Sequence, residues 1–192
     1  GFDMEVLPLD SHDVFQMGIY KITPSRIQLD QPVDISFTNS EGLALYRYDD
    51  DFLAWRIVQE SIYSEGHLIL QTDRLGDFAL GAFIDVSAPS FLTVFDELLE
   101  QAPEQTVGYQ MLVGYELNDV IIEIPQTHIQ GGCNGFVHQG NKDEITILRR
   151  SARVLVDDVE ELVDFVFIAH WLVSDANKCT QEDLAIVPNV IE

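Results

Sequence analysis

The sequence predicts an all-β protein made of two antiparallel β-sandwiches. Three observations lead to this fold class. Short runs of strand-forming residues recur about every ten residues, turn-forming residues fill the gaps between them, and no stretch of the first half keeps a convincing helical period. The 192 residues are 46% hydrophobic, which is enough for a core, and the length fits one large domain or two small ones.

The first half contains about seven strand-like runs, and we expect a first sandwich over residues 1–86. Pro, Asn, Asp, Ser and Gly occupy the intervals between the runs, as turns require. The run VDISF alternates clearly, with Val33, Ile35 and Phe37 on one face. The expected strands cover residues 4–9, 17–23, 33–37, 43–48, 52–58, 67–72 and 77–83.

The second half follows a small polar segment, DVSAPS, which predicts a linker. Leu98 and Leu99, with acidic neighbours, suit a helical turn. The alternation of Phe91, Thr93 and Phe95 favours a strand instead, and a strand is what we expect there. A second sandwich should cover residues 91–192, with further strands at 106–117, 120–124, 144–148, 152–156, 164–173 and 184–187 and a glycine-rich loop at 131–141.

The chain is strongly acidic, with 33 Asp and Glu against 10 Lys and Arg and a formal net charge of −23. This balance excludes nucleic-acid binding, because phosphate backbones need clustered positive charge. It also argues against adhesion to an anionic membrane. No apolar run approaches the ~20 residues of a membrane-spanning helix, so we expect no membrane insertion. Simple solubility and a salty environment account for the acid excess equally well.

The two cysteines, Cys133 and Cys179, lie in loop-like sequence. They lack the CxxC spacing of zinc ligands. In a secreted protein they would form a disulfide, which stabilises by roughly 3–4 kcal/mol for a loop of this length. Two buried free thiols are the alternative. His128 and His138 flank Cys133, but a metal or nucleophile cluster is disfavoured, because no helix N-terminus or positive neighbour is evident to stabilise a thiolate.

An acidic triplet, Asp49, Asp50 and Asp51, stands at the expected tip of a hairpin. Carboxylates that converge from a loop are the ligands that Ca²⁺ requires. The EF-hand spacing is absent, however, and a solvated charged turn is the simpler interpretation. The triplet is therefore a candidate calcium site that no motif supports.

Three of the ten basic residues, Arg149, Arg150 and Arg153, lie within five positions. On so acidic a chain, this group is a candidate for pairing with an acidic patch on a neighbouring copy or domain. Internal ion pairs with Asp157 or Asp158 across a hairpin are the alternative.

Several aromatic residues invite a comparison with carbohydrate-binding platforms, in which exposed rings stack on sugars. A tryptophan in a central strand more often fills the core of a sandwich, and we favour that interpretation. The residues concerned are Tyr46, Tyr48, Trp55, Tyr63 and Trp171.

The first half also follows a recognisable succession of motifs. It runs from MGIYKITPSRIQLDQPVDISF through LALYRYDDDFLAW to RLGDFALGAF and ends on D-x-x-A-P. In this order, residues 17–90 resemble an Ig-like β-sandwich module found near the C-terminal ends of large secreted or cell-surface bacterial proteins. The resemblance implies an Ig-like sandwich for this half and, by analogy, for the second. It also implies a spacer, adhesion or assembly role.

Taken together, these features predict an extracellular, non-catalytic structural, adhesion or assembly module that binds protein neighbours through loops and strand edges. A subunit of a surface filament or layer is one form of it, in which segment 1–16 donates a strand to the next copy. The alternative is a carbohydrate-binding or ancillary module of a secreted hydrolase. We expect no catalytic residues, since the sequence has no phosphate-binding glycine loop and no GxSxG motif.

Overall fold

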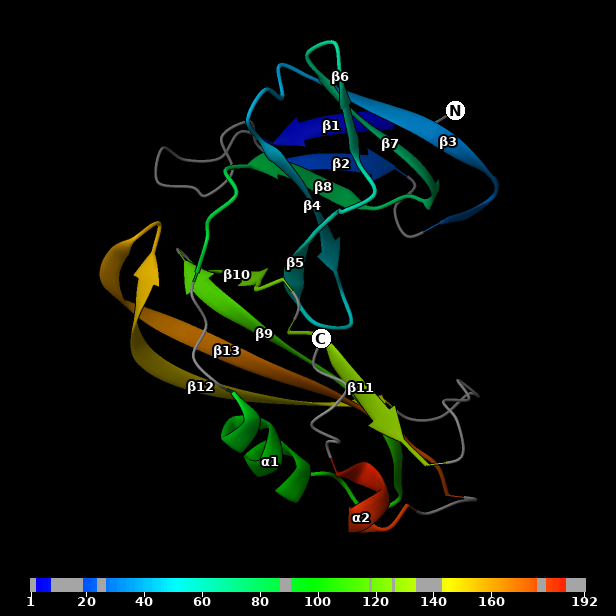
Figure 1. The fold of residues 1–192 in the computed structure, drawn as a ribbon. Coiled ribbons are helices and arrows are strands. Elements are labelled where there is room, and N and C mark those ends of the chain that lie inside the picture. The colour runs from blue at the N-terminus through cyan, green and yellow to red at the C-terminus, as the bar shows by residue number, and fades with distance from the viewer. Residues whose placement is uncertain are drawn as a thin grey trace. The chain divides into compact units, whose positions relative to one another are not determined.

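The computed structural model describes residues 3–7, 19–23, 27–86, 91–117, 119–125, 127–133, 143–175 and 179–185. Within these ranges the chain consists mostly of strands, with two helices, so the predicted all-β class is confirmed (Figure 1). The chain divides into two compact units. The first contains residues 1–84 and 117–120, and the second contains residues 85–116 and 121–192.

The first unit contains two antiparallel sheets. One sheet has the order β1-β2-β8-β4-β5 and consists of β1 (Asp3–Leu7), β2 (Ile19–Thr23), β8 (Asp77–Gly81), β4 (Ala44–Asp49) and β5 (Ala54–Ile57). The other has the order β3-β7-β6 and consists of β3 (Gln28–Thr38), β7 (His67–Arg74) and β6 (Ile62–Ser64).

The core of the first unit lies between these two sheets. Phe37 of β3, which the sequence places on one face with Val33 and Ile35, is buried against Phe78 of β8 with ring centroids 5.8 Å apart. Val33 and Ile35 pack against the same cluster, as the alternation of VDISF predicts. Residues from both sheets therefore share one apolar interior, which is the arrangement of a β-sandwich. The buried members are Ile22, Phe37, Leu45, Val58, Leu68, Leu70, Leu75, Phe78 and Leu80.

One expectation for the first unit is wrong. Residues 52–53 belong to the turn before β5, where Phe52 is buried and Leu53 has a positive φ of 52°. The N-terminal strand pairs with β2 of its own chain, from Asp3 opposite Thr23 to Leu7 opposite Ile19, and its donation to another copy stays a prediction. Residues 8–18 lie outside the described part of the chain.

The second unit is built on one antiparallel sheet with the order β10-β9-β13-β12, and β11 also pairs with β9. Among the described residues no second sheet faces it, so the second predicted sandwich is not confirmed. No helix of the described residues is long and apolar enough to cross a membrane. The strands are β9 (Thr106–Leu117), β10 (Val120–Glu123), β11 (Ile129–Gly132), β12 (Asp143–Val156) and β13 (Val159–Val173).

Helix α1 (Leu92–Glu100) replaces the strand expected after the linker. It buries Phe95, Leu98 and Leu99, whose spacing of three and four residues is that of one helical face. Phe95 packs against Phe167 of β13, with ring centroids 6.3 Å apart. The expectation failed because aromatic side chains four residues apart, at positions 91 and 95, satisfy both a strand period and a helix period.

Helix α2 (Gln181–Leu184) stands where the last strand was expected to begin. Thr180 and Asp183 form a capping box, in which each side chain accepts from the other residue's backbone N–H. This local pairing starts a helical turn and ends with Leu184 buried. Residues 186–187 of the expected strand lie outside the described part. The strands expected at 144–148 and 152–156 form one continuous strand, β12.

Candidate interaction surface

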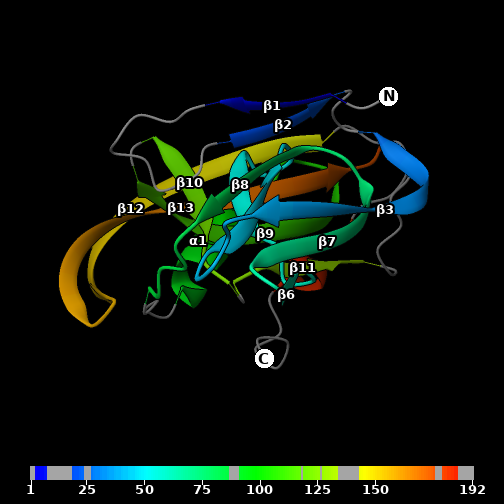
Figure 2. The same ribbon diagram turned by 90° about the horizontal axis from the view of Figure 1, so that it is seen from above.

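The β12–β13 hairpin is the longest paired element in the described part of the chain. Its register is continuous from Asp143 opposite Leu172 to Val156 opposite Val159. Residues 165–173 of β13 are buried, whereas 159–162 and Asp164 are exposed. The turn end of the hairpin extends beyond β9 and curves away from the rest of its sheet (Figures 1 and 2). The hairpin is therefore anchored at one end and exposed at the other.

Apolar side chains are exposed near the turn end. Leu155 is 47% exposed, Val159 57% and Leu162 65%. Leu155 lies opposite Glu160, and Leu162 lies opposite Arg153. Residues directly opposite each other point to the same face, so both leucines share one face as diagonal neighbours. Exposed apolar side chains that gather on one element are typical of contact surfaces.

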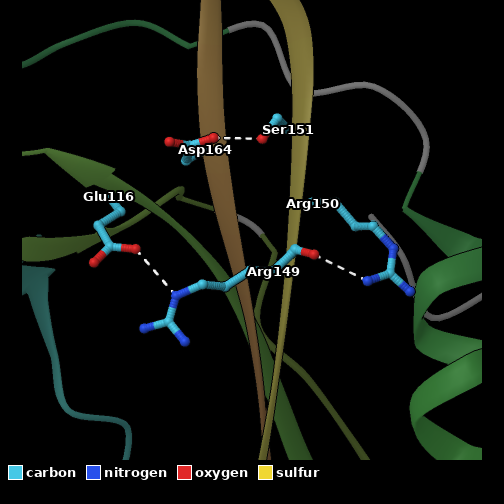
Figure 3. A network of polar contacts seen from close by, with 5 residues as sticks. All are labelled: Glu116, Arg149, Arg150, Ser151 and Asp164. Carbon is cyan, nitrogen blue, oxygen red and sulfur yellow. Dashed lines mark hydrogen bonds and ion pairs between the residues drawn. The ribbon is translucent and has the colours of Figure 1, made fainter.

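Arg149 and Arg150 occupy the middle of β12 (Figure 3). Arg149 Nε donates to Glu116 Oε2 of β9 at 3.1 Å, and Arg150 Nη2 donates to Glu97 Oε2 of α1 at 2.6 Å. Arg150 Nη1 also donates to the carbonyl oxygen of Arg149 at 2.9 Å. Both partners of the Arg150–Glu97 pair are 48% exposed, so the pair contributes at most about 1 kcal/mol. Arg153 is exposed as well. The Arg150–Glu97 pair is weak enough to exchange partners.

The internal partners differ from those that the sequence suggests. Arg149 and Arg150 lie opposite Val166 and Phe165 and do not reach Asp157 or Asp158, which form the hairpin turn. Both have positive φ values, 48° and 65°, as the two central residues of a type I′ turn require. Asp157 Oδ1 accepts from the backbone N–H of Asp85 at 3.2 Å, and the N–H of Asp157 donates to the Asp85 carbonyl at 3.1 Å. The turn is thereby attached to the start of the second unit.

The outer edge of β12 is the second feature of this surface. β12 is the last strand in the order of its sheet, and among the described strands it pairs with β13 alone. Near the turn end, an isolated bridge between Val86 and Val156 covers the edge. Ile145 is 42% exposed. A strand edge of this kind offers backbone N–H and C=O groups to another chain, and charged side chains on it are the usual protection against indiscriminate pairing.

The acidic triplet lies in the first unit and forms a hydrogen-bonded turn. Asp49 Oδ1 accepts from the backbone N–H of Asp51 at 3.0 Å, and Asp49 Oδ2 accepts from Arg56 Nη1 at 2.9 Å. The triplet lines a polar pocket of about 510 Å³ together with Arg47 and Arg74. Within the described residues, no group of three or more His, Cys, Asp or Glu is placed to hold a metal ion. Calcium binding at the triplet stays a prediction.

The cysteines are joined, so the disulfide and not the pair of free thiols is the correct alternative. Cys133 and Cys179 form a disulfide that links the end of β11 to the residue before the α2 cap. Both backbone N–H groups donate to β9, from Cys133 to Val107 at 3.1 Å and from Cys179 to Thr106 at 3.4 Å. A bonded Cys133 has no thiol to act as a nucleophile. His138, which the sequence places with His128 beside this cysteine, lies outside the described part.

The aromatic residues form core contacts for the most part. Trp55 and Trp171 are both buried, and Trp171 Nε1 donates to Thr146 Oγ1 at 2.8 Å. Tyr46 is buried and donates its hydroxyl to the Ala82 carbonyl at 3.0 Å. Burial raises the pKa of Tyr46 to about 12. Neither tryptophan presents its ring to solvent, which removes the two largest members of the candidate sugar platform.

Sequence reasoning found the arginines but not the apolar residues beside them. Leu155 and Leu162 flank the Asp157-Asp158 turn in a strongly acidic stretch, and an apolar residue in such a stretch is the signal that could have found them.

No family model, no curated protein and no solved structure matches this chain.

Proposed function

We propose that this chain is an extracellular, non-catalytic structural, adhesion or assembly module that binds protein neighbours through the β12–β13 hairpin. The observation that carries this proposal is the exposed end of the hairpin, where Leu155, Val159 and Leu162 lie beside a long strand edge. Large apolar side chains at such positions cost solubility unless a partner covers them. An assembly role explains why they are there.

An extracellular setting is supported by the disulfide between Cys133 and Cys179. Disulfides persist in oxidising compartments and are rare in the reducing cytosol. The Ig-like character of the first unit belongs to the same proposal. Two antiparallel sheets around a shared core support it, together with the resemblance of residues 17–90 to Ig-like modules of bacterial surface proteins. Such modules present edges and loops from a rigid scaffold.

Site-specific photo-crosslinking in the producing cells tests the proposal. A photoreactive amino acid at Leu162, which is 65% exposed, should give a defined protein adduct on intact cells. The matched control is Ile62 of the first unit, which is equally apolar and 67% exposed, and which should give none. Leu155→Ser should reduce the adduct at position 162. Equal adducts at both positions, or none at 162, would contradict the proposal.

A further inference from the structure

We infer that the outer edge of β12 pairs with β12 of a second copy of this chain, in antiparallel register about Ile147. This inference rests on the proposed function, because it names a partner for the strand edge of the same hairpin, while the exposed residues Leu155, Val159 and Leu162 lie outside the paired stretch. It starts from the distribution of charge along β12. Glu144 lies near one end of the strand, Arg149 and Arg150 lie at its middle, and Arg153 lies toward the other end. An antiparallel copy places the acidic end of one strand beside the basic part of its neighbour.

The symmetry of such a dimer restricts the register. Two identical edge strands that pair antiparallel are related by a two-fold axis perpendicular to the sheet. Residues directly opposite each other point to the same face, and side chains alternate along a strand. Each residue must therefore lie opposite one that is an even number of positions away. The centre of the pairing falls on a single residue that lies opposite its own copy.

Charge pairing excludes two of the registers near the middle of β12 and favours a third. Centring on Arg149 or Arg150 places that arginine against its own copy. With Ile147 at the centre, Glu144 lies opposite Arg150 of the other copy, and this pair occurs twice. Opposite charges across a strand pair are favourable and like charges are unfavourable. The register about Ile147 therefore has two favourable pairs where the arginine-centred registers have a repulsive one.

The neighbouring registers bring opposite charges together only through Asp143, the first residue of β12. Centring on Thr146 places Asp143 opposite Arg149, and centring on Leu148 places it opposite Arg153. The ends of an element fray more readily than its interior, so a pair at the first residue contributes less. The register about Thr146 also draws Arg149 from Glu116, whose side chain is only 28% exposed and is left without its cation.

The edge of the single chain is compatible with pairing about Ile147. The carbonyl oxygen of Arg149 accepts from the guanidinium of Arg150 at 2.9 Å. A neighbouring strand can replace that bond with a backbone N–H and release the guanidinium. The Arg150–Glu97 pair is half exposed on both sides, so Arg150 can interact with Glu144 of the other copy at little cost. The Val86–Val156 bridge limits the paired edge to the residues before Val156.

Apolar side chains favour this register over the one about Leu148. Ile145 and Ile147 point to one face of β12, and Ile145 is 42% exposed. In the dimer the two Ile147 residues are direct neighbours, and Ile145 is a diagonal neighbour of the other copy's Ile147, within reach of long side chains. Four isoleucines then form one apolar patch, while the two Glu144–Arg150 pairs lie on the opposite face. Both registers place one isoleucine opposite Arg149, Ile145 in the register about Ile147 and Ile147 in the register about Leu148, but only the register about Ile147 puts two isoleucines directly opposite each other.

Charge reversal tests the pairing by sedimentation velocity of the purified 192-residue chain. Wild type should show concentration-dependent dimerisation. Glu144→Arg and Arg150→Glu should each raise the dissociation constant at least about tenfold, because each places like charges opposite one another twice. An equimolar mixture of the two variants should recover association, since every pair then joins opposite charges. Arg153→Glu is the matched control, with the same charge change on the same strand, and should have a smaller effect.

A cysteine scan tests the register separately. Ile147→Cys should give a disulfide-linked dimer on a non-reducing gel, because the introduced thiol lies opposite its own copy. Thr146→Cys should give far less, since position 146 then lies opposite Leu148. Circular dichroism checks that each variant is folded. A monomeric wild type, a mixture that fails to recover, or a linked dimer at 146 but not at 147 would overturn the inference. If the wild-type chain is monomeric but the photoreactive group at position 162 still crosslinks to another protein, self-pairing is overturned and the proposed function is not.

Discussion

Replacing both cysteines should destabilise the second unit by about 4 kcal/mol. Cys133 and Cys179 are separated by 46 residues. Closing a loop of that length in the unfolded chain removes about 13 to 14 cal/mol/K of entropy, which corresponds to about 4 kcal/mol at 25 °C. The double variant Cys133→Ser/Cys179→Ser avoids leaving one reactive thiol. With a urea m-value of roughly 2 kcal/mol per molar, the midpoint of unfolding should fall by about 2 M.

The assay must report on the second unit alone, because two units need not unfold together. The chain has two tryptophans, Trp55 in the first unit and Trp171, fully buried, in the second. In a Trp55→Phe background, the fluorescence of Trp171 follows the second unit. In a Trp171→Phe background, Trp55 follows the first unit, whose midpoint should change little. If the free energy of unfolding of the second unit falls by less than about 1 kcal/mol, the loop-closure argument is refuted.

Three further predictions follow from buried groups and from the acidic turn. Burial raises the pKa of Tyr46 from 10.0 to about 12, so the unfolded state loses this proton first. The stability associated with Tyr46 is then present below pH 10 and is lost as the pH rises through about 12, and Tyr46→Phe should remove that part of the pH dependence measured by urea unfolding. Phe95→Ala should cost about 3–5 kcal/mol, because it opens a cavity under α1, whereas Thr93→Ala on the exposed side of the helix should cost less than about 0.5 kcal/mol in the same denaturation experiment. Calcium bound at Asp49–Asp51 would raise the thermal midpoint in a way that EGTA reverses, and an unchanged midpoint would remove that interpretation.

The fold class was predictable because its signals are local. Alternation in VDISF indicated the inward face of β3, and turn residues marked the ends of most strands. The errors arose where two periods coincide. Phe91 and Phe95 satisfy both a two-residue and a four-residue repeat, and only the burial of Leu98 and Leu99 favours the helix. The last strand was mistaken because a four-residue capping box at Thr180 outweighed a short apolar run.

The interaction surface was predictable only in part, because its contacts join distant positions. The arginine group is visible in composition alone. Its partners are not, since Glu97 is 53 residues from Arg150 and Glu116 is 33 residues from Arg149. Local sequence patterns also fail to predict that β12 is one continuous strand of a long hairpin. Arg149, Arg150 and Ser151 interrupt the apolar run and suggest a break, whereas pairing with β13 continues through all three positions.

The net charge of −23 determines how self-pairing should respond to salt. Two chains of this charge repel each other over tens of ångströms, whereas the two Glu144–Arg150 pairs act at contact distance and each contributes at most about 1 kcal/mol. The screening length shortens from about 30 Å at 0.01 M salt to about 8 Å at 0.15 M, which removes most of the long-range repulsion but weakens contact pairs less. Dimerisation should therefore strengthen as salt rises over this range. An association governed by the ion pairs alone would weaken instead, and sedimentation at the two salt concentrations separates these cases.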